Sequence, residues 1–223
     1  MSDMTNVTTG EVRLSYVHLF KPYAHMAGLE EKFSCTVLVP KTDTDTMGRI
    51  HAAIEAAKQK GVSDMWNGSC PPIVQTPVYD GDGIRPSDGD EFGPECKGHW
   101  VFTARAKTDY PPEVVDQNLN PIINQSEMYS GVYARVNVSF FPYSFGGKKG
   151  IGCGLGAIQK LRDGEALGGS MPSASKAFSS QRPAGAYGIM GQSQHGYGQP
   201  SYGPAPSQAA PAGGINPITG MPY

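Results

Sequence analysis

The sequence lacks any long hydrophobic run, and this absence excludes the first large class of proteins. No stretch of the 223 residues approaches the ~20 apolar residues that a membrane-spanning helix needs. The first ten residues are polar and contain no apolar core of the kind found in secretory signal peptides. The sequence therefore predicts a cytoplasmic protein.

The motifs that identify the common enzyme classes are also missing. No Walker phosphate-binding loop is present, and the glycine-rich segment 150–156 does not have the spacing of a dinucleotide-binding fingerprint. The five histidines form no pair with metal-ligand spacing, and no nucleophile has a recognisable catalytic setting. We therefore expect a protein without enzymatic activity and without a cofactor.

Cysteine is scarce, and its four residues are scattered along a chain long enough to fold without disulfide bonds. Reduced thiols are the expected state of Cys35, Cys70, Cys96 and Cys153. The alternative is a zinc site formed by Cys70, Cys96 and His99, but this set lacks a second closely spaced ligand pair.

Carboxylates gather in one long, irregular loop. The turn 80–83 permits calcium binding, although the residues that follow do not fit an EF-hand. A metal-dependent nuclease could use Asp80 and Asp82 together with Asp88, Asp90 and Glu91. A flexible loop without an anchoring strand is a poor support for such a site, so we expect an acidic loop without metal.

Acidic residues are absent after Glu165, so the parts of the chain before and after this residue differ in net charge. The part up to Glu165 holds all 20 acidic residues and 16 of the 18 basic ones, which gives it a net charge of −4. An acidic body does not attract nucleic acid through its overall charge. Nucleic-acid binding would therefore require a local basic surface.

The end of the chain lacks both leucine and valine. Of the 53 residues from Met171 onward, 17 are glycine or proline, so this segment has too little apolar surface to form a core. We predict a folded domain at 1–169 and a disordered tail at 170–223. The Tyr-Gly pairs of the tail are typical of self-associating segments, although an inert tether would fit the same composition.

Patterns typical of β-strands dominate the rest. Strands are predicted at residues 11–18, 32–39, 99–106, 128–143 and 151–161, with a turn at 146–150. In the first, Val12, Leu14 and Tyr16 share the face expected to be buried. An amphipathic helix is predicted at 45–60, with capping side chains at 42–46 and its end at Gly61. One helix and about five strands indicate a sandwich or a small barrel.

Two strands place aromatic and cationic side chains on the face opposite the core. Segment 99–107 buries Trp100 and Phe102 on one face and ends the other with two cations, while 128–143 alternates apolar residues with aromatic and polar ones. Rings stack on unpaired bases, and cations neutralise phosphates. The candidate DNA contacts are Arg105, Lys107, Tyr133, Arg135, Asn137, Phe141, Tyr143, Lys148 and Lys149. Alternatively, the rings pack under the long loops, and Arg135 pairs with the acidic loop.

Four segments, 10–20, 33–41, 131–137 and 149–165, resemble those of phage and prophage single-stranded DNA-binding proteins of the OB-fold type. This family is distantly similar to the T7-type single-stranded DNA-binding protein. The resemblance covers residues 10–169, and its last segment is the most specific.

The resemblance implies a mainly β fold, a five-stranded OB-fold-like Greek-key barrel with one main helix and long loops. It also implies sequence-independent single-stranded DNA binding in phage replication, recombination or repair, in the host cytoplasm. A polymerase or recombinase partner is implied as well. Members often end in an acidic tip that contacts partners, and this chain departs from that pattern. The alternative is a non-enzymatic structural or assembly protein that uses the low-complexity tail.

Overall fold

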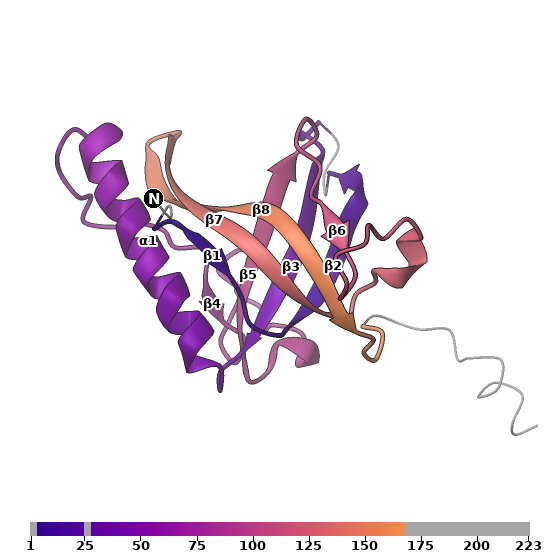
Figure 1. Cartoon of the computed structure of the whole chain (residues 1–223). Helices are drawn as coiled ribbons and strands as arrows, with labels where there is room; N and C mark the ends of the chain where they lie inside the picture. The colour runs from indigo at the N-terminus through magenta and orange to yellow at the C-terminus, as the bar shows by residue number, and fades with distance from the viewer. Residues whose placement is uncertain (1–3, 25–27, 168–223) are drawn as a thin grey trace, which may run out of the picture. The chain divides into compact units, whose positions relative to one another are not determined.

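The computed structural model describes residues 4–24 and 28–167. Within these residues, five long strands alternate with one helix and several short elements (Figure 1). The long strands are β2 (Val12–Tyr23), β3 (Lys32–Pro40), β5 (His99–Lys107), β7 (Tyr133–Phe145) and β8 (Lys148–Arg162). The others are β1 (Asn6–Thr8), β4 (Tyr79–Asp80), β6 (Val114–Val115), α1 (Thr44–Asp64) and the 3-10 turns Pro94–Cys96 and Gln125–Glu127. The predicted tail, 170–223, lies outside the described residues.

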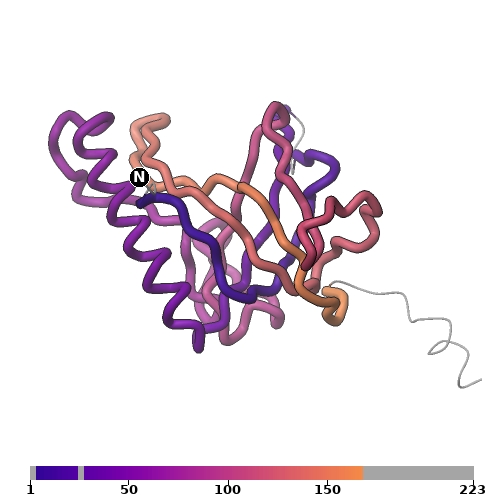
Figure 2. Tube along the Cα trace, in the orientation of Figure 1, coloured from indigo at the N-terminus to yellow at the C-terminus, as the bar shows by residue number. Residues whose placement is uncertain are grey.

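The long strands close into a barrel. Strand β2 pairs antiparallel with β3, and β3 pairs in the same way with β5. Strand β5 then runs parallel to β8, which forms a long antiparallel hairpin with β7, and β7 returns to β2. This order, with one parallel pair among the long strands, is that of an OB-fold barrel. Figure 2 traces the chain through these strands in the orientation of Figure 1. The predicted mainly β fold with one helix is confirmed.

Strand alternation decides what fills the barrel. In β7, Ala134, Val136, Val138 and Phe140 are at most 1% exposed, as the sequence pattern predicts. Phe102 of β5 meets Phe140 inside, with ring centroids 6.3 Å apart. Trp100 differs from its prediction because it is only half-buried and lies under Lys41. The odd-numbered side chains of β7 therefore face away from the core.

Helix α1 packs along β7 and contacts β1 on the outside of the barrel. Asp43 caps it by accepting a hydrogen bond from the backbone N–H of Thr46 at 3.0 Å. The prediction that Gly61 ends this helix is wrong, because the helix continues to Asp64. Gly61 instead allows Trp66 and Pro142 to pack close to the helix backbone, because a Cβ there would lie 2.8 Å from both residues.

Strand β7 begins at Tyr133 rather than at the predicted Met128. Gly131, at φ 119°, interrupts the extended chain just before it. In the part of the chain that is described, no helix is long and apolar enough to cross a membrane.

Candidate nucleic-acid interface

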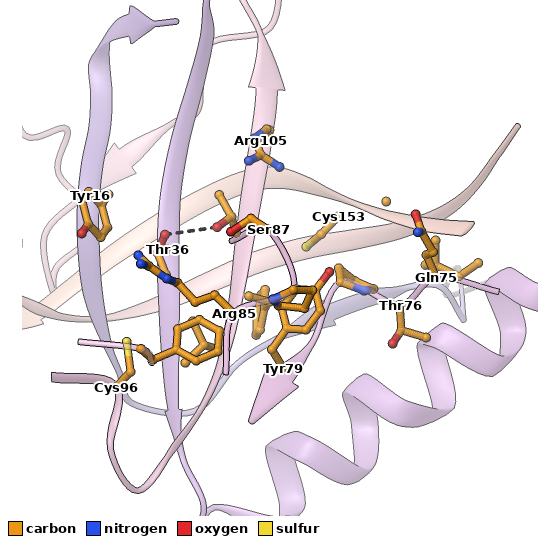
Figure 3. A pocket seen from close by; sticks show the side chains of 18 of the residues that line it. Tyr16, Thr36, Gln75, Thr76, Tyr79, Arg85, Ser87, Cys96, Arg105 and Cys153 are labelled. Atoms are coloured by element: carbon orange, nitrogen blue, oxygen red, sulfur yellow. Dashed lines mark hydrogen bonds between the residues drawn. The ribbon is translucent and has the colours of Figure 1, made fainter. Parts of the chain in front are cut away.

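A groove of about 720 Å³ lies on the outer face of the barrel. Its floor comes from adjacent strands: Thr36 of β3, Thr103 and Arg105 of β5, and Gly152 of β8. Two loop segments, 75–79 and 85–96, form its walls. Figure 3 shows Tyr16 at one side of this hollow, Gln75 at the other, and Arg85 and Tyr79 between them. The hydroxyls of Thr36 and Thr103 form a hydrogen bond of 3.1 Å on this floor.

Two of the predicted DNA contacts, Arg105 and Tyr143, line this groove. Arg105 is exposed and stands beside Gly154 of β8, its register partner. Among the described residues, its guanidinium forms no ion pair. An exposed guanidinium without a carboxylate partner is available to an anion that enters the groove.

A third predicted contact, Phe141, adjoins the groove through Gly152. The two residues are register partners in the β7–β8 hairpin, and a Cβ on Gly152 would lie 2.6 Å from the Phe141 ring. The far end of the ring therefore lies close over the backbone of β8 at Gly152. Phe141 is 47% exposed, so its other side faces solvent.

Three predicted contacts lie farther along β7 and are engaged with protein groups. The Tyr133 ring lies under Arg162, whose Cζ is 3.5 Å from the ring centroid. Arg135 donates a hydrogen bond to the carbonyl of Thr9 at 3.4 Å. Asn137 donates to side-chain oxygens of Asn6 and Thr8 at 2.7 and 3.0 Å. Tyr133 and Phe141 are eight residues apart, or about 26 Å along a strand. The structure does not bring these three side chains into the groove.

The remaining predicted cations surround the groove without lining it. Lys107 is exposed at the end of β5, and its register partner is Lys32 of β3. Strand parity places Lys148 on the same face of the β7–β8 hairpin as Phe141 and Tyr143. Lys149 follows on the opposite face.

Tyr16 is a groove residue that the sequence pattern misplaced. The alternation of β2 predicts a buried side chain, whereas Tyr16 is 65% exposed and Ser15 is 4% exposed. The register of β2 against β3 shifts between Ser15 and His18, and Tyr16 has a φ of 47°. This bulge reverses the alternation and turns the ring outward. Nothing in the local sequence marks it, because bulges seldom carry a signal in the side chains.

Arg85 is a second groove residue that the sequence did not single out. Its guanidinium pairs with Asp88 at 3.2 Å and with Asp90 at 3.6 Å, while its Nε is buried and has no hydrogen-bond partner. Phe92 and Tyr79 line the same part of the groove. The available signal was the length of the loop, since long loops in compact domains are often functional.

The side chain of Lys41 forms ion pairs with the first two carboxylates of the acidic loop. Lys41 Nζ lies 2.5 Å from Asp80 and 2.6 Å from Asp82, and Asp82 also accepts the backbone N–H of Gly98. These hydrogen bonds hold the pKa of both carboxyls below its ordinary value and raise the pKa of Lys41. The contacts anchor the loop 81–97 to the end of β3.

The four cysteines are free thiols. Cys35, Cys96 and Cys153 are buried and Cys70 is exposed. No group of three or more His, Cys, Asp or Glu side chains within residues 4–24 and 28–167 has an arrangement that could hold a metal ion.

A family model matches residues 5–186, and its description is the single-stranded DNA-binding protein of Enterobacter phage Enc34. The match covers most of the chain. The chain belongs to this family. The resemblance seen in the sequence is therefore confirmed.

Individual proteins are also similar to this chain. A putative protein, p50, of Acyrthosiphon pisum secondary endosymbiont phage 1 is 30% identical over 169 residues, covering 73% of this chain and 86% of the relative. The Enc34 protein solved in complex with single-stranded DNA is 28% identical, with a TM-score of 0.60 over 74% of this chain and 90% of that one. The single-stranded DNA-binding protein of bacteriophage T7 shares the fold alone, at 14% identity and a TM-score of 0.50 over 83% of this chain and 98% of that one.

Proposed function

We propose that this chain binds single-stranded DNA without strong sequence preference, through the groove on the outer face of the barrel. The observation that carries the proposal is that Arg105 of β5 and the rings of Phe141 and Tyr143 of β7 lie on one surface, with β8 between the two strands. Aromatic stacking supplies sequence-tolerant affinity, because every base has a π-face, and a cation beside the rings neutralises the backbone. Membership of the Enc34 family supports the same conclusion.

In this proposal the DNA crosses the strands rather than following one of them. Bases stack on Phe141 and Tyr143 at the β7–β8 side and on Tyr16 at the β2 side, all three of which have exposed or half-exposed rings. Phosphates are held by Arg105 and by Lys107 and Lys148 at the margins. The other predicted contacts, which have no role inside the groove in this proposal, are Lys149, Tyr133, Arg135 and Asn137. Stacking and charge neutralisation need neither a cofactor nor a catalytic group.

The groove favours a single strand over a duplex for a geometric reason. Phe141 lies close against β8 and is 47% exposed, so a base must turn its face toward the barrel in order to stack on the ring. The bases of a duplex have their faces covered by neighbouring base pairs. The net negative charge of the body adds a general repulsion that only the local cations offset.

We further propose that the protein acts in phage DNA replication, recombination or repair within the bacterial host. A protein that covers single strands serves each of these processes, and the phage origin of the family supports this setting. Binding of replication or recombination proteins through the C-terminal tail and self-association are part of the same proposal. The tail lies outside the described residues.

Anisotropy with labelled oligo-dT, and with a duplex of equal length, tests the proposed activity. We expect binding to oligo-dT at low salt, on the order of tenfold or more tighter than to the duplex. Raising salt from about 50 mM to about 200 mM should weaken it steeply, because phosphate contacts release counterions. Equal affinity for both DNAs, or no binding to oligo-dT at low salt, would contradict the proposal. Affinity that is independent of salt would remove the role of the cations.

A further inference from the structure

We infer that Gly152 is a positioning residue for base stacking: it lets the Phe141 ring lie close against β8 with one face open to a base. The inference rests on the proposed function and names a residue that supports it without touching DNA through a side chain. Gly152 is one of four glycines that occupy every second position from 150 to 156 in β8.

The glycines of β8 all point to the outer face, where the odd-numbered residues of β7 also lie. Ile151, Cys153 and Leu155 alternate with them and are buried at 2%, 7% and 8% exposure. Gly150 pairs with Tyr143 and Gly152 with Phe141, so each ring has a glycine directly beside it. The alternation therefore gives β8 an apolar inner face and a bare outer face.

The rings of Phe141 and Tyr143 in β7 pack against this glycine backbone. A Cβ on Gly152 would meet the Phe141 ring at 2.6 and 2.7 Å, and a Cβ on Gly150 would meet the Tyr143 ring and hydroxyl at 2.6–2.8 Å. Contacts shorter than 3.0 Å are essentially never made by real Cβ atoms, so either ring would have to move. Tyr143 is additionally held by a hydrogen bond between its hydroxyl and Gln75 Oε1, at 3.1 Å. No such bond can hold Phe141.

Phe141 thus lies against the backbone of β8 on its inner side. With 47% of its surface exposed, its outer face is free for a base. Arg105 stands across β8, on the order of 10 Å away at two strand spacings, which suits a base on the ring and a neighbouring phosphate on the guanidinium. A methyl group at position 152 would lift the ring and tilt its open face away from this arrangement.

The test compares four variants of the full chain in oligo-dT binding: Phe141→Ala, Gly152→Ala, the double variant, and Gly156→Ala. The last is the matched control, because its Cβ would clash just as closely, at 2.6 Å, but with Asn137, whose amide bonds to Asn6 and Thr8 away from the groove. Thermal unfolding of each variant separates folding from binding.

We expect F141A to weaken binding about tenfold, because it removes a ring on which a base stacks. G152A should weaken oligo-dT binding by most of that factor, whereas the affinity of G156A should stay within about twofold of the wild type. The double variant should bind as F141A alone does. Wild-type affinity in G152A, or an equal loss from G152A with and without Phe141, would overturn the inference. If the wild type does not bind oligo-dT, it is the proposed function that fails.

Photo-cross-linking supplies a measurement that needs no variant and so remains available if G152A does not fold. An oligonucleotide with iodouracil cross-links to rings on which the base is stacked. We expect Phe141 among the cross-linked residues of the wild-type protein after digestion and mass spectrometry. Cross-links confined to other residues would overturn the inference.

Discussion

At the scale of single residues, neighbouring carboxylates and rings decide which cationic side chains are available to bind DNA. Arg162 pairs with Glu11 at 2.6 Å and covers Tyr133, whereas Arg105 is exposed on the groove floor. Arg85 lies between these cases, since it faces the groove while paired with Asp88 and Asp90. A phosphate would have to displace those two carboxylates, so Arg105 is the cation from which we expect the clearest effect.

Replacing Arg105 with Gln should lower both the affinity for oligo-dT and its dependence on salt. For single strands, each phosphate contact contributes ~0.7 to the slope of log K against log salt, so the loss of one contact should flatten the slope by about that amount. Arg162→Gln, which alters an arginine outside the groove, is the control and should leave the slope unchanged. An R105Q slope equal to that of the wild type would show that this guanidinium holds no phosphate.

Strand alternation predicted the direction of side chains but not their contacts with other strands. Alternation correctly predicted the buried side of β7 and the outward direction of Phe141 and Tyr143. It did not separate these rings from Tyr133, because a face of a strand is defined by parity, whereas contact with Arg162 and Arg13 depends on other strands. The predicted contacts of β7 therefore share a face without all sharing a groove, and Lys149 of β8 lies on the opposite face.

At the scale of elements, the loop between β4 and β5 forms one wall of the groove and is fixed at its base by Lys41. Hydrogen bonds from Lys41 hold the pKa of Asp80 and Asp82 below the ordinary 3.8, and they raise the pKa of Lys41 above 10.5. A carboxyl whose native pKa is lowered stabilises the fold fully above its ordinary value. That stabilisation is lost as the pH falls through the native pKa.

Lys41→Met should therefore destabilise the protein near neutral pH, with a deficit that shrinks once the pH falls below about 3.8. Urea unfolding of the wild type and of K41M over a series of pH values measures this deficit. Lys58→Met removes a partly buried lysine that pairs with Glu55 within α1, and it serves as the control. A K41M deficit that persists unchanged to about pH 3 would show that the ion pairs do not stabilise the loop.

At the scale of the whole molecule, burial separates three protected thiols from one accessible thiol. Burial raises the pKa of Cys35 to about 12 and of Cys96 to about 11, and it raises the pKa of Cys153 as well. Since the thiolate is the reactive form, these three thiols are protected twice, by low accessibility and by protonation. Cys70 is exposed.

We expect one thiol of the native protein to react rapidly with Ellman's reagent near pH 8 and the other three to react only on unfolding in urea. Cys70→Ser should remove the fast reaction and leave the slow one unchanged. A second fast thiol in the native protein would show that one of the buried positions opens locally, without global unfolding.

Local chemistry along the chain was sufficient to predict the strand-rich fold, the single helix, the direction of the β7 side chains and the family. These depend on the period of apolar residues and on short motifs, which are properties of neighbouring positions. The groove was decided only by tertiary structure: the bulge that turns Tyr16 outward, the loop that brings Arg85, and the parallel pairing that sets Arg105 beside β8. Each of these depends on contacts between segments distant in sequence, whose free energy no local pattern records.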